Sequence, residues 1–252
     1  MKLVRPNTLD AGLTLVSTNV AAEHPTYNPA TTYAKDTKVI SGRKVFESLQ
    51  AGNLGKPVTD PAWWIDLGAA NAFAMFDQYN GTQTLNAGSI AVELTATGRI
   101  DTLALLNVSA ASVHLKMSTA LDGVIHEENR TLVSASGINN WHDYFYEPIT
   151  RLSDCLFYGL PNFANPTLEI TITAPAGTAK AGVAIIGQGR DLGDTTYGAQ
   201  TGIQDYSKKT TDEFGNFQII KRAYAKRGTF KLVVENARVD ALSDMLAAYR
   251  AE

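Results

Sequence analysis

The first segment of this sequence that could do chemistry is glycine-rich: Gly187-Gln188-Gly189-Arg190-Asp191-Leu192-Gly193. It follows a predicted strand, as a nucleotide-binding loop does. A phosphate-binding loop must also open a helix, because the amide groups of the first helical turn bind the anion. Residues 194–198 have no helical periodicity, and the glycine spacing differs by one residue from the dinucleotide motif. We therefore expect no nucleotide site and no cofactor.

The four histidines could bind a metal ion or act as general bases. They lie in separate segments, as His24, His114, His126 and His142. No pair has the four-residue spacing that places two ligands on one helix face, and the His-Glu-x-x-His motif is missing. At His142-Asp143, within an aromatic segment, we expect packing beside a strand end rather than a catalytic base. The sequence therefore predicts no metal site.

Carboxylates and the cysteine are the remaining candidates for catalysis. Glu127-Glu128 and Asp212-Glu213 lie in polar segments that we interpret as solvated turns. Glycosidases need two carboxylates about 5–9 Å apart across a cleft, and nothing in the sequence indicates one. No Gly-x-Ser-x-Gly nucleophile elbow is present. Cys155, the single cysteine, has apolar neighbours and is predicted to be a buried, inert thiol. We therefore predict no catalytic residues and no enzyme.

The composition is that of an ordinary globular protein. The chain has 252 residues, of which 44% are hydrophobic and 19% charged, and its net charge is -3. A negative net charge argues against a dedicated nucleic-acid-binding protein. No run approaches the roughly 18 apolar residues of a membrane span, and residues 1–7 do not begin a signal peptide. We expect synthesis in a reducing cytoplasm, without membrane insertion.

Short strands with alternating apolar and polar residues dominate the middle of the chain. They are predicted at residues 90–96, 100–105, 112–117 and 168–174, with residues 63–67 as the first strand of the same unit. Gly and Asn turns separate them, and no long helical period intervenes. This pattern predicts a mainly β protein with an antiparallel β-sandwich at residues 61–190, rather than a parallel sheet covered by helices.

A smaller module is predicted on each side of the sandwich. Residues 1–60 are expected to form a small β module, with a strand at 13–20 and a hairpin that turns at Ser41-Gly42. Residues 191–252 are expected to hold a β-hairpin at Gly215-Asn216 and a final helix. We interpret residues 187–202 as a strandless linker, predict strands at 217–220 and 229–234, and expect Asn236 to cap the helix.

Two surfaces of the C-terminal part are candidates for subunit contacts. Between Asp205 and Lys231, seven basic residues stand against three acidic ones. We prefer a polar subunit interface to a nucleic-acid patch there, because adjacent charges on a strand point to opposite faces. The helix carries an apolar stripe at spacings of three or four. The candidate interface residues are Lys208, Lys209, Lys221, Arg222, Lys226, Arg227, Leu242, Leu246 and Tyr249.

The N-terminal module resembles the small chitin-binding type of carbohydrate-binding module, families 5 and 12. The matching positions are Tyr27, Tyr33, Asp36, Val39, Phe46, Gly55 with Pro57, and Trp63 or Trp64. The resemblance implies a glycan platform formed by Tyr27, Tyr33, Trp63 and Tyr79. The family usually carries exposed aromatic residues after the Phe46 position, where this chain has Ser48-Leu49. Leucine does not offer a flat ring with a polar edge, so we favour a structural clip.

The central unit resembles the galactose-binding-like jelly roll. That fold often begins with a strand that reads apolar-Asp-Leu-Gly and ends with one that reads apolar-Gly. The corresponding stretches here are Trp64-Ile65-Asp66-Leu67-Gly68, Thr82-Gln83-Thr84 and Val183-Ala184-Ile185-Ile186-Gly187. The resemblance implies that the predicted sandwich is a jelly roll.

Across nearly its whole length the chain resembles a family of tail proteins of tailed bacteriophages. The resemblance rests on residues 197–200, 205–216 and 221–227, and on the order of residues 64–68, 76–77 and 141–145. It implies a virion protein of the tail tip or baseplate, synthesised in the host bacterial cytoplasm, that links the tail to fibres or receptor-binding proteins. The implied partners are other tail proteins and further copies of this chain in a ring. The alternatives are a module that binds host cell-surface glycans and, least favoured, a depolymerising enzyme.

Overall fold

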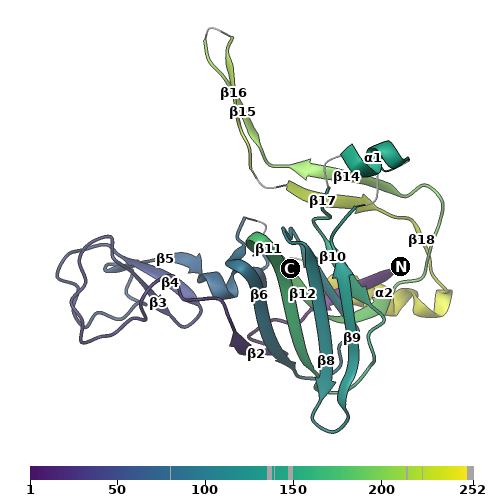
Figure 1. Ribbon diagram of the computed structural model, residues 1–252, viewed down its shortest axis with the longest axis horizontal. Coiled ribbons are helices and arrows are strands. Elements are labelled where there is room, and N and C mark those ends of the chain that lie inside the picture. Colours follow the sequence, from purple (N-terminus) through teal and green to yellow (C-terminus); the bar gives the residue numbers. More distant parts are fainter. Residues whose placement is uncertain are drawn as a thin grey trace. The chain divides into compact units, whose positions relative to one another are not determined.

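The structure is a computed structural model that describes residues 1–79, 81–134, 138, 140–146, 150–213, 215–222 and 224–248. The chain forms two compact units (Figure 1). The larger unit is Asn7–Ile185, and the smaller one combines Met1–Pro6 with Ile186–Glu252. Antiparallel strands make up most of the described chain, so the predicted mainly β class and β-sandwich are confirmed.

Two antiparallel sheets form the sandwich. The four-stranded sheet has the order β1-β12-β7-β10 and the five-stranded sheet the order β2-β6-β11-β8-β9. The strands are β1 (Lys2–Pro6), β2 (Leu13–Thr18), β6 (Thr84–Ala96), β7 (Thr102–Leu106), β8 (Ser112–Thr119), β9 (Gly123–Thr131), β10 (Cys155–Tyr158), β11 (Thr167–Ala181) and β12 (Val183–Asp191). If β2 is left out and the other eight strands are renumbered 1 to 8 in chain order, the four-stranded sheet has the order 1-8-3-6 and the remaining four strands have the order 2-7-4-5. This interleaving is the double Greek key of a jelly roll.

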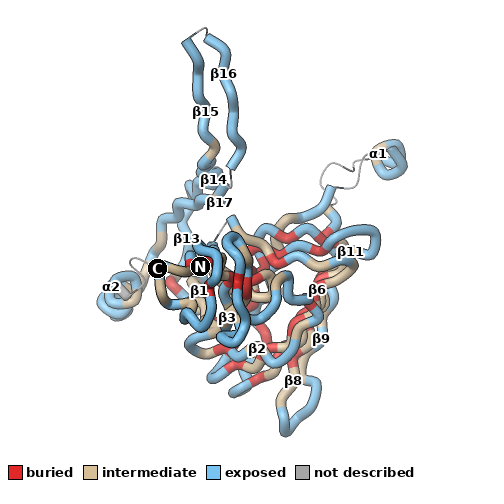
Figure 2. The backbone as a smooth tube through the Cα atoms, turned by 90° about the vertical axis from the view of Figure 1, so that its left-hand side faces the viewer, coloured by how far each residue is buried: buried red, intermediate tan, exposed pale blue. Residues whose placement is uncertain are grey.

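Strict alternation along the strands builds the sandwich core. In β11, Leu168, Ile170 and Ile172 are completely buried, whereas Glu169 and Thr171 point away from the core. Side chains on a strand alternate between its two faces, so every second residue of β11 enters the core. Buried residues recur along β6, β8 and β11 of one sheet, where Figure 2 shows buried stretches alternating with less buried ones, and also along β7, β10 and β12 of the other.

The clip, defined here as residues 25–69, is a three-stranded sheet of β3 (Lys38–Ser41), β4 (Lys44–Ser48) and β5 (Trp64–Ala69). The predicted hairpin at Ser41-Gly42 is present, and Gly42 supplies the positive φ of its turn, 61°. The prediction that residues 63–67 begin the sandwich is wrong. β5 pairs with β4, with Trp64 opposite Ser48, and Trp64 is buried inside the clip.

The N-terminal residues also differ from the prediction of a separate module at 1–60. β1 and β2 belong to the two sandwich sheets, because each pairs along its length with a sandwich strand, β12 and β6. Two short helices follow later in the larger unit, η1 (Asn71–Phe76) and α1 (Trp141–Tyr146). Neither was expected from the sequence.

Three two-stranded ribbons and a helix make up much of the smaller unit. β13 (Asp194–Thr195) pairs with β18 (Leu232–Val233), β14 (Gln200–Asp205) with β17 (Tyr224–Thr229), and β15 (Lys208–Thr211) with β16 (Phe217–Ile220). The predicted strand at 217–220 is confirmed, whereas the range 229–234 holds the last residue of β17 and the short β18 rather than one continuous strand. A helical turn, η2 (Asn236–Arg238), precedes α2 (Val239–Ala248), and the residue before η2 is Glu235, so Asn236 is not the cap.

The predicted strandless linker at 187–202 is also wrong, because β12 continues through Gly187 to Asp191 opposite β1. A side chain at Gly187 would collide with the backbone oxygen of Arg5, so glycine is what lets the two strands approach. The same glycines that looked like a loop therefore serve strand pairing.

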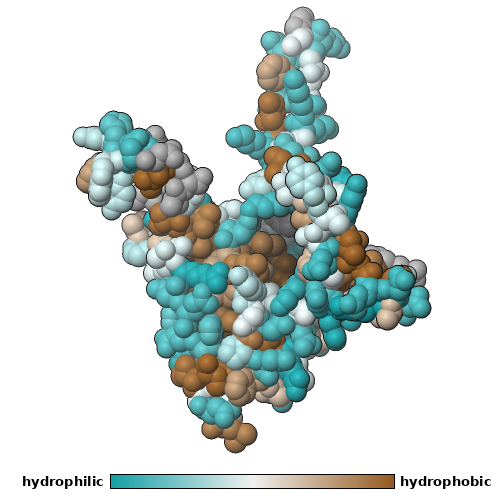
Figure 3. Space-filling view, turned by 90° about the vertical axis from the view of Figure 1, so that its right-hand side faces the viewer, coloured by the Kyte–Doolittle hydropathy of each residue, from teal (hydrophilic) through white to brown (hydrophobic). Residues whose placement is uncertain are grey.

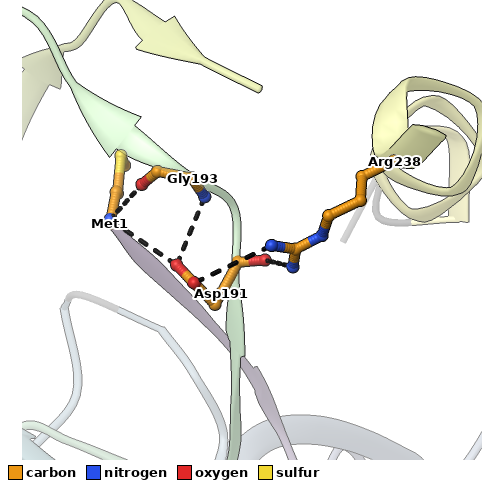
Figure 4. Close-up of polar contacts among 4 residues, drawn as sticks. All are labelled: Met1, Asp191, Gly193 and Arg238. Carbon is orange, nitrogen blue, oxygen red and sulfur yellow. Dashed lines mark hydrogen bonds and ion pairs between the residues drawn. The ribbon is translucent and has the colours of Figure 1, made fainter. Parts of the chain in front are cut away.

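A polar cluster fixes the end of β12 (Figure 4). The Asp191 carboxylate accepts a hydrogen bond from Gly193 N at 3.2 Å and lies 3.8 Å from the Met1 amino group. The Arg238 guanidinium donates to the Asp191 backbone oxygen at 2.9 Å. The Gly193 hydrogen bond, followed by the nearby positive charges, lowers the pKa of Asp191. This cluster ties β1, β12 and the helical end of the smaller unit together.

Candidate functional site

The residues that could have done chemistry are not brought together. Glu127-Glu128 lie in strand β9, not in the predicted turn, and each has a cationic or histidine neighbour. Asp212 does lie in a turn, where it accepts hydrogen bonds from the backbone of Gly215 and Asn216. Within the described ranges, no group of three or more His, Cys, Asp or Glu side chains is placed to hold a metal ion. The chemistry-bearing residues therefore do not define a candidate site.

The predicted burial of Cys155 is confirmed. The thiol is in β10, 4% exposed, and burial raises its pKa. A raised pKa keeps the sulfur in its weakly nucleophilic thiol form.

The aromatic segment around His142 is not packed beside a strand end as predicted. It forms α1, in which Trp141 is 77% exposed, and Tyr144, Phe145 and Tyr146 are exposed as well. The rings contact one another instead, with Trp141 stacked on Phe145 at a centroid distance of 6.2 Å. These aromatic side chains form a small exposed cluster on a helix of six residues.

Most of the predicted glycan platform lies inside the clip. Tyr33 is 7% exposed and packs with Trp64, at a centroid distance of 5.4 Å. Tyr27 and Trp63 are half-buried against the same cluster. The hydroxyl of Tyr27 and the indole N–H of Trp64 both donate to the Lys56 backbone oxygen, at 2.7 and 3.0 Å. These rings build the core of the clip, so they do not form an exposed stacking surface.

Tyr79, the fourth residue of that platform, lines an open groove of about 1000 Å³ in the larger unit. The groove lies between the β3–β4 turn, the end of β5, residues 8–10 and the segment from η1 to Tyr79. Its aromatic members are Phe73, Phe76 and Tyr79, and its charged members are Asp10, Arg43, Lys44, Asp66 and Asp77. Its volume is in the range of small-ligand sites, but its lining is more strongly charged than that of a typical apolar ligand pocket.

Ion pairs hold the polar side chains of this groove. Lys44 Nζ lies 2.6 Å from Asp66 Oδ2, and Arg43 pairs with Asp10. The Lys44 ammonium lowers the pKa of Asp66, and Asp66 in turn raises the pKa of Lys44. Both side chains are partly exposed, so the pair contributes little to stability and is accessible to a ligand.

A tight turn holds Tyr79 at the groove. Asp77 accepts hydrogen bonds from Tyr79 N at 2.8 Å and from the Thr82 hydroxyl at 2.8 and 2.9 Å. The intervening Gln78 has a φ of 63°, a conformation that non-glycine residues rarely adopt. The Tyr79 side chain is 70% exposed. Its backbone is therefore fixed while its ring stays open to solvent.

The second candidate site is the arm, defined here as residues 200–229. It consists of the two ribbons β14–β17 and β15–β16. Of its described residues, only Ser207 and Ala225 are even half-buried, and the others are exposed (Figure 2). Six large apolar side chains are among the exposed ones: Ile203, Tyr206, Phe217, Ile219, Ile220 and Tyr224. Brown apolar side chains are visible among teal ones along the ribbon at the top of Figure 3.

The arm also carries the predicted basic residues. Lys208 and Lys209 are in β15, Lys226 and Arg227 are in β17, and Lys221 and Arg222 lie between β16 and β17. Lys209 Nζ lies 4.3 Å from the centre of the Phe217 ring. Cationic and apolar groups therefore share the same exposed face of the β15–β16 ribbon.

The apolar stripe of the helix, predicted as a surface for subunit contacts, is only partly exposed. Leu242 and Met245 are half-buried and line a small hollow of about 60 Å³ with Leu192 and Val234. Leu246 is 52% exposed, and Tyr249 lies outside the described residues. Sequence periodicity identified the helix, but its inner side chains pack within the smaller unit.

Sequence reasoning missed the groove because its walls come from three separate segments. Asp66 entered the sequence analysis only through the jelly-roll pattern, and Arg43 and Lys44 lie in the hairpin predicted to turn at Ser41-Gly42. The signal in the sequence was the Arg43-Lys44 pair beside the predicted turn at Ser41-Gly42, together with Asp66 shortly after Trp63-Trp64.

No helix of the described chain has the length and apolar character needed to cross a bilayer. A scan against models of known protein families gives no match, and a search of curated protein sequences gives none either.

Proposed function

We propose that this chain is a non-enzymatic virion protein of a bacteriophage tail tip or baseplate, which links the tail to fibres or receptor-binding proteins through ring-forming subunit contacts. The exposed arm is the observation that carries the proposal. The arm exposes apolar and basic side chains on ribbons that have no core of their own.

Such a ribbon needs a partner. An isolated two-stranded hairpin is marginally stable in water, because it buries too little apolar surface to offset the entropy of ordering the chain. Large exposed apolar side chains rimmed by polar residues mark interaction surfaces in soluble proteins. The arm combines both features, so we expect it to be covered by another protein in the assembled state.

The rest of the chain suits a structural role. A jelly roll with a continuous core is a rigid support, and the part of the sequence that resembles tail proteins includes the arm itself, at residues 205–216 and 221–227. In a closed ring each subunit contact is strengthened by the others, so weak individual contacts suffice. This reasoning favours assembly by many copies over a single tight interface.

An arm deletion tests the proposal directly. Thr196 N donates to Lys231 O at 2.9 Å, so the chain ends that flank the arm lie side by side. Replacing residues 198–229 with a short Gly-Ser linker should leave a folded protein that sediments as a monomer, while the intact chain forms a larger species. Leu121→Ser, at an exposed turn between β8 and β9, is the control and should not change assembly.

Particles provide the second test. The chain should co-purify with virions, and electron microscopy of labelled particles should locate it at the tail. An intact chain that stays monomeric at high concentration and never co-purifies with virions would contradict the proposal.

Glycan binding is a second candidate function. The groove at Tyr79 supports it better than the predicted platform of four aromatic residues does. Tyr79 offers an exposed ring for stacking on a sugar, and the nearby carboxylates and cations can hydrogen-bond to hydroxyl groups. A glycan array should show binding that Tyr79→Ala abolishes. Tyr197→Ala, which removes a fully exposed tyrosine from the smaller unit, is the matched control. Binding that both variants retain would exclude the groove.

A further inference from the structure

We infer that the arm of one copy docks on the outer face of the five-stranded sheet of a second copy, across a transverse row of charged side chains. The inference rests on the proposed function, since it names the partner and the surface that the arm recognises. Four observations support it: the geometry of the row, its charge, the shape of the face and the charge of the arm.

The row crosses all five strands of the sheet. It consists of Ser17 in β2, Glu93 in β6, Glu169 in β11, Lys116 in β8 and Glu127 in β9, each opposite the next in the strand register. Their neighbours along β11, Leu168 and Ile170, are completely buried. The row therefore lies on the outer face, away from the sandwich core.

The charges of the row are unbalanced within the sheet. The row holds three carboxylates and one ammonium group, that of Lys116, whose Nζ lies 2.8 Å from Glu169. Glu127 lies 3.0 Å from His114 Nε2, and Glu93 accepts a hydrogen bond from the Ser17 hydroxyl at 3.0 Å, so Glu93 has no cation of its own among these contacts. Glu169 raises the pKa of Lys116, and the more distant Glu127 and Glu93 add to the effect. Glu93 and Glu169 stand directly opposite each other on adjacent strands, an arrangement that destabilises a sheet when both side chains are charged. An external cationic partner would relieve this repulsion.

The face offers room and suitable chemistry for a ribbon. A shallow groove of about 350 Å³ runs beside Glu93 and Glu169, lined otherwise by small side chains such as Ser17, Ala91 and Thr171. Small side chains project little from the sheet, so the backbone of a two-stranded ribbon can approach this face closely. The groove lies wholly within the larger unit.

The arm has the complementary charge. Within residues 200–229 the chain has six basic and three acidic side chains, a net charge of +3. Lys226 and Arg227 are adjacent in β17, so one points to each face of the ribbon. Each face of the β14–β17 ribbon therefore carries one of these two cationic side chains, opposite in sign to the Glu93–Glu169 pair. Charge complementarity of this kind selects the partner and fixes its register.

Docking of this kind is head-to-tail, because the arm and the sheet face are different surfaces. Each copy can then give one contact and receive one, which closes a ring or extends a filament. Two arms that pair with each other would instead stop at a dimer. The difference between these two arrangements makes the inference testable.

Neutralising the sheet face is the first experiment. Glu93→Gln with Glu169→Gln should weaken self-association by about tenfold, as measured by sedimentation velocity. The double variant should melt close to the parent, because it removes a like-charge pair and loses only the partly exposed Lys116–Glu169 ion pair. Glu47→Gln, in the clip, is the control and should associate as the parent does. If the sheet-face variant assembles normally, the inference is wrong, although an arm-dependent ring would still support the proposed function.

Mixing two defective copies is the second experiment. The arm-deleted chain keeps its sheet face, and the Glu93→Gln, Glu169→Gln chain keeps its arm. Head-to-tail docking predicts that an equimolar mixture forms a 1:1 complex through the arm of the second chain and the intact sheet face of the first. At a concentration where the second chain alone has dissociated because of its weaker self-association, neither variant alone should form this complex. Lys226→Glu with Arg227→Glu in the second chain should abolish that complex. The inference is wrong if the two chains do not form a complex when they are mixed. It is also wrong if the charge-reversed chain forms the complex equally well.

Discussion

Strand β11 and the β15–β16 ribbon have similar patterns of apolar and polar residues but differ in how far their apolar side chains are buried. In both, apolar residues occur near polar ones in short extended segments, as in Leu168-Glu169-Ile170 and Phe217-Gln218-Ile219. Ile170 is 0% exposed, whereas Ile219 is 56% exposed. The difference comes from neighbours: β11 has a strand on each side and a second sheet beneath it, but β15 and β16 have only each other.

This contrast shows what each region contributes. The sandwich stabilises itself, because each strand places one face in a shared core. The arm leaves both faces to solvent, so its apolar residues are available to a partner instead. The sandwich therefore supplies most of the buried core, whereas the proposed contacts with other chains fall on the arm.

The largest expected effect comes from truncating the same side chain in the two regions. Ile170→Ala should lower the free energy of unfolding by about 2–5 kcal/mol, since it leaves a cavity in the core. Ile219→Ala should change it by less than about 0.5 kcal/mol, because the side chain is already in solvent. Urea denaturation of both variants measures the difference. Equal losses would mean that the arm is covered within the monomer.

A pair of glycines sharpens the comparison. Gly187→Ala should destabilise the protein by about 1–3 kcal/mol, since a methyl group would collide with the Arg5 backbone oxygen between β1 and β12. Gly202→Ala, in β14 of the arm, meets nothing within 4 Å and should be neutral. Thermal melts of the two variants provide the measurement. A neutral Gly187→Ala would show that β1 can shift without cost.

A smaller effect is expected within the arm. Lys209→Ala removes the cation from the Phe217 ring and should weaken the β15–β16 ribbon locally by about 0.5–1 kcal/mol. Hydrogen exchange of amides in β16 should speed up, while the melting temperature of the sandwich stays the same. Lys208→Ala, whose cross-strand partner is Ile220, serves as the control. A change in β11 exchange would contradict the independence of the two regions.

The smallest effect is a pH dependence at the end of β12. The pKa of Asp191 in the folded protein lies below its ordinary value of 3.8, chiefly because of the Gly193 hydrogen bond. Its contribution to stability is therefore present above pH 3.8 and is lost as the pH falls through the lower, folded pKa. Exchange of the Gly193 amide should increase over that acidic range. Asp191→Asn should remove the pH dependence, and an unchanged profile would show that another group is responsible.

The strands that the sequence predicted best are those with the cleanest alternation. Residues 168–174 lie in β11 and residues 112–117 in β8, because a strict period of two allows only one face to be buried. The helix at the end was also predicted from its apolar spacing. The errors lie at Gly187 and Trp64, where pairing with a distant strand decides the structure and the neighbouring residue types do not. Gly187 was interpreted as a loop residue, yet it lies in a paired strand. Trp64 was assigned to the sandwich, yet it closes the clip.

The candidate sites depended on tertiary structure to different degrees. The basic residues of the arm were predicted as an interface from charge alone, and the structure places most of them on exposed ribbons. The glycan platform was predicted from aromatic residues, but three of its four members pack in or against the clip core. Residue type does not distinguish a ring that stacks on a sugar from one that fills a core, since both uses need a flat apolar face.

By itself, the sequence determined the class of fold, the alternation of the main strands and the positive charge of the arm, because these depend on residue type and on spacing along the chain. Tertiary structure alone decided which strands pair, which aromatic rings are buried, and that Glu93 and Glu169 stand opposite each other. These features depend on contacts between segments far apart in the chain. Local periodicity carries no information about which distant segment will be the neighbour.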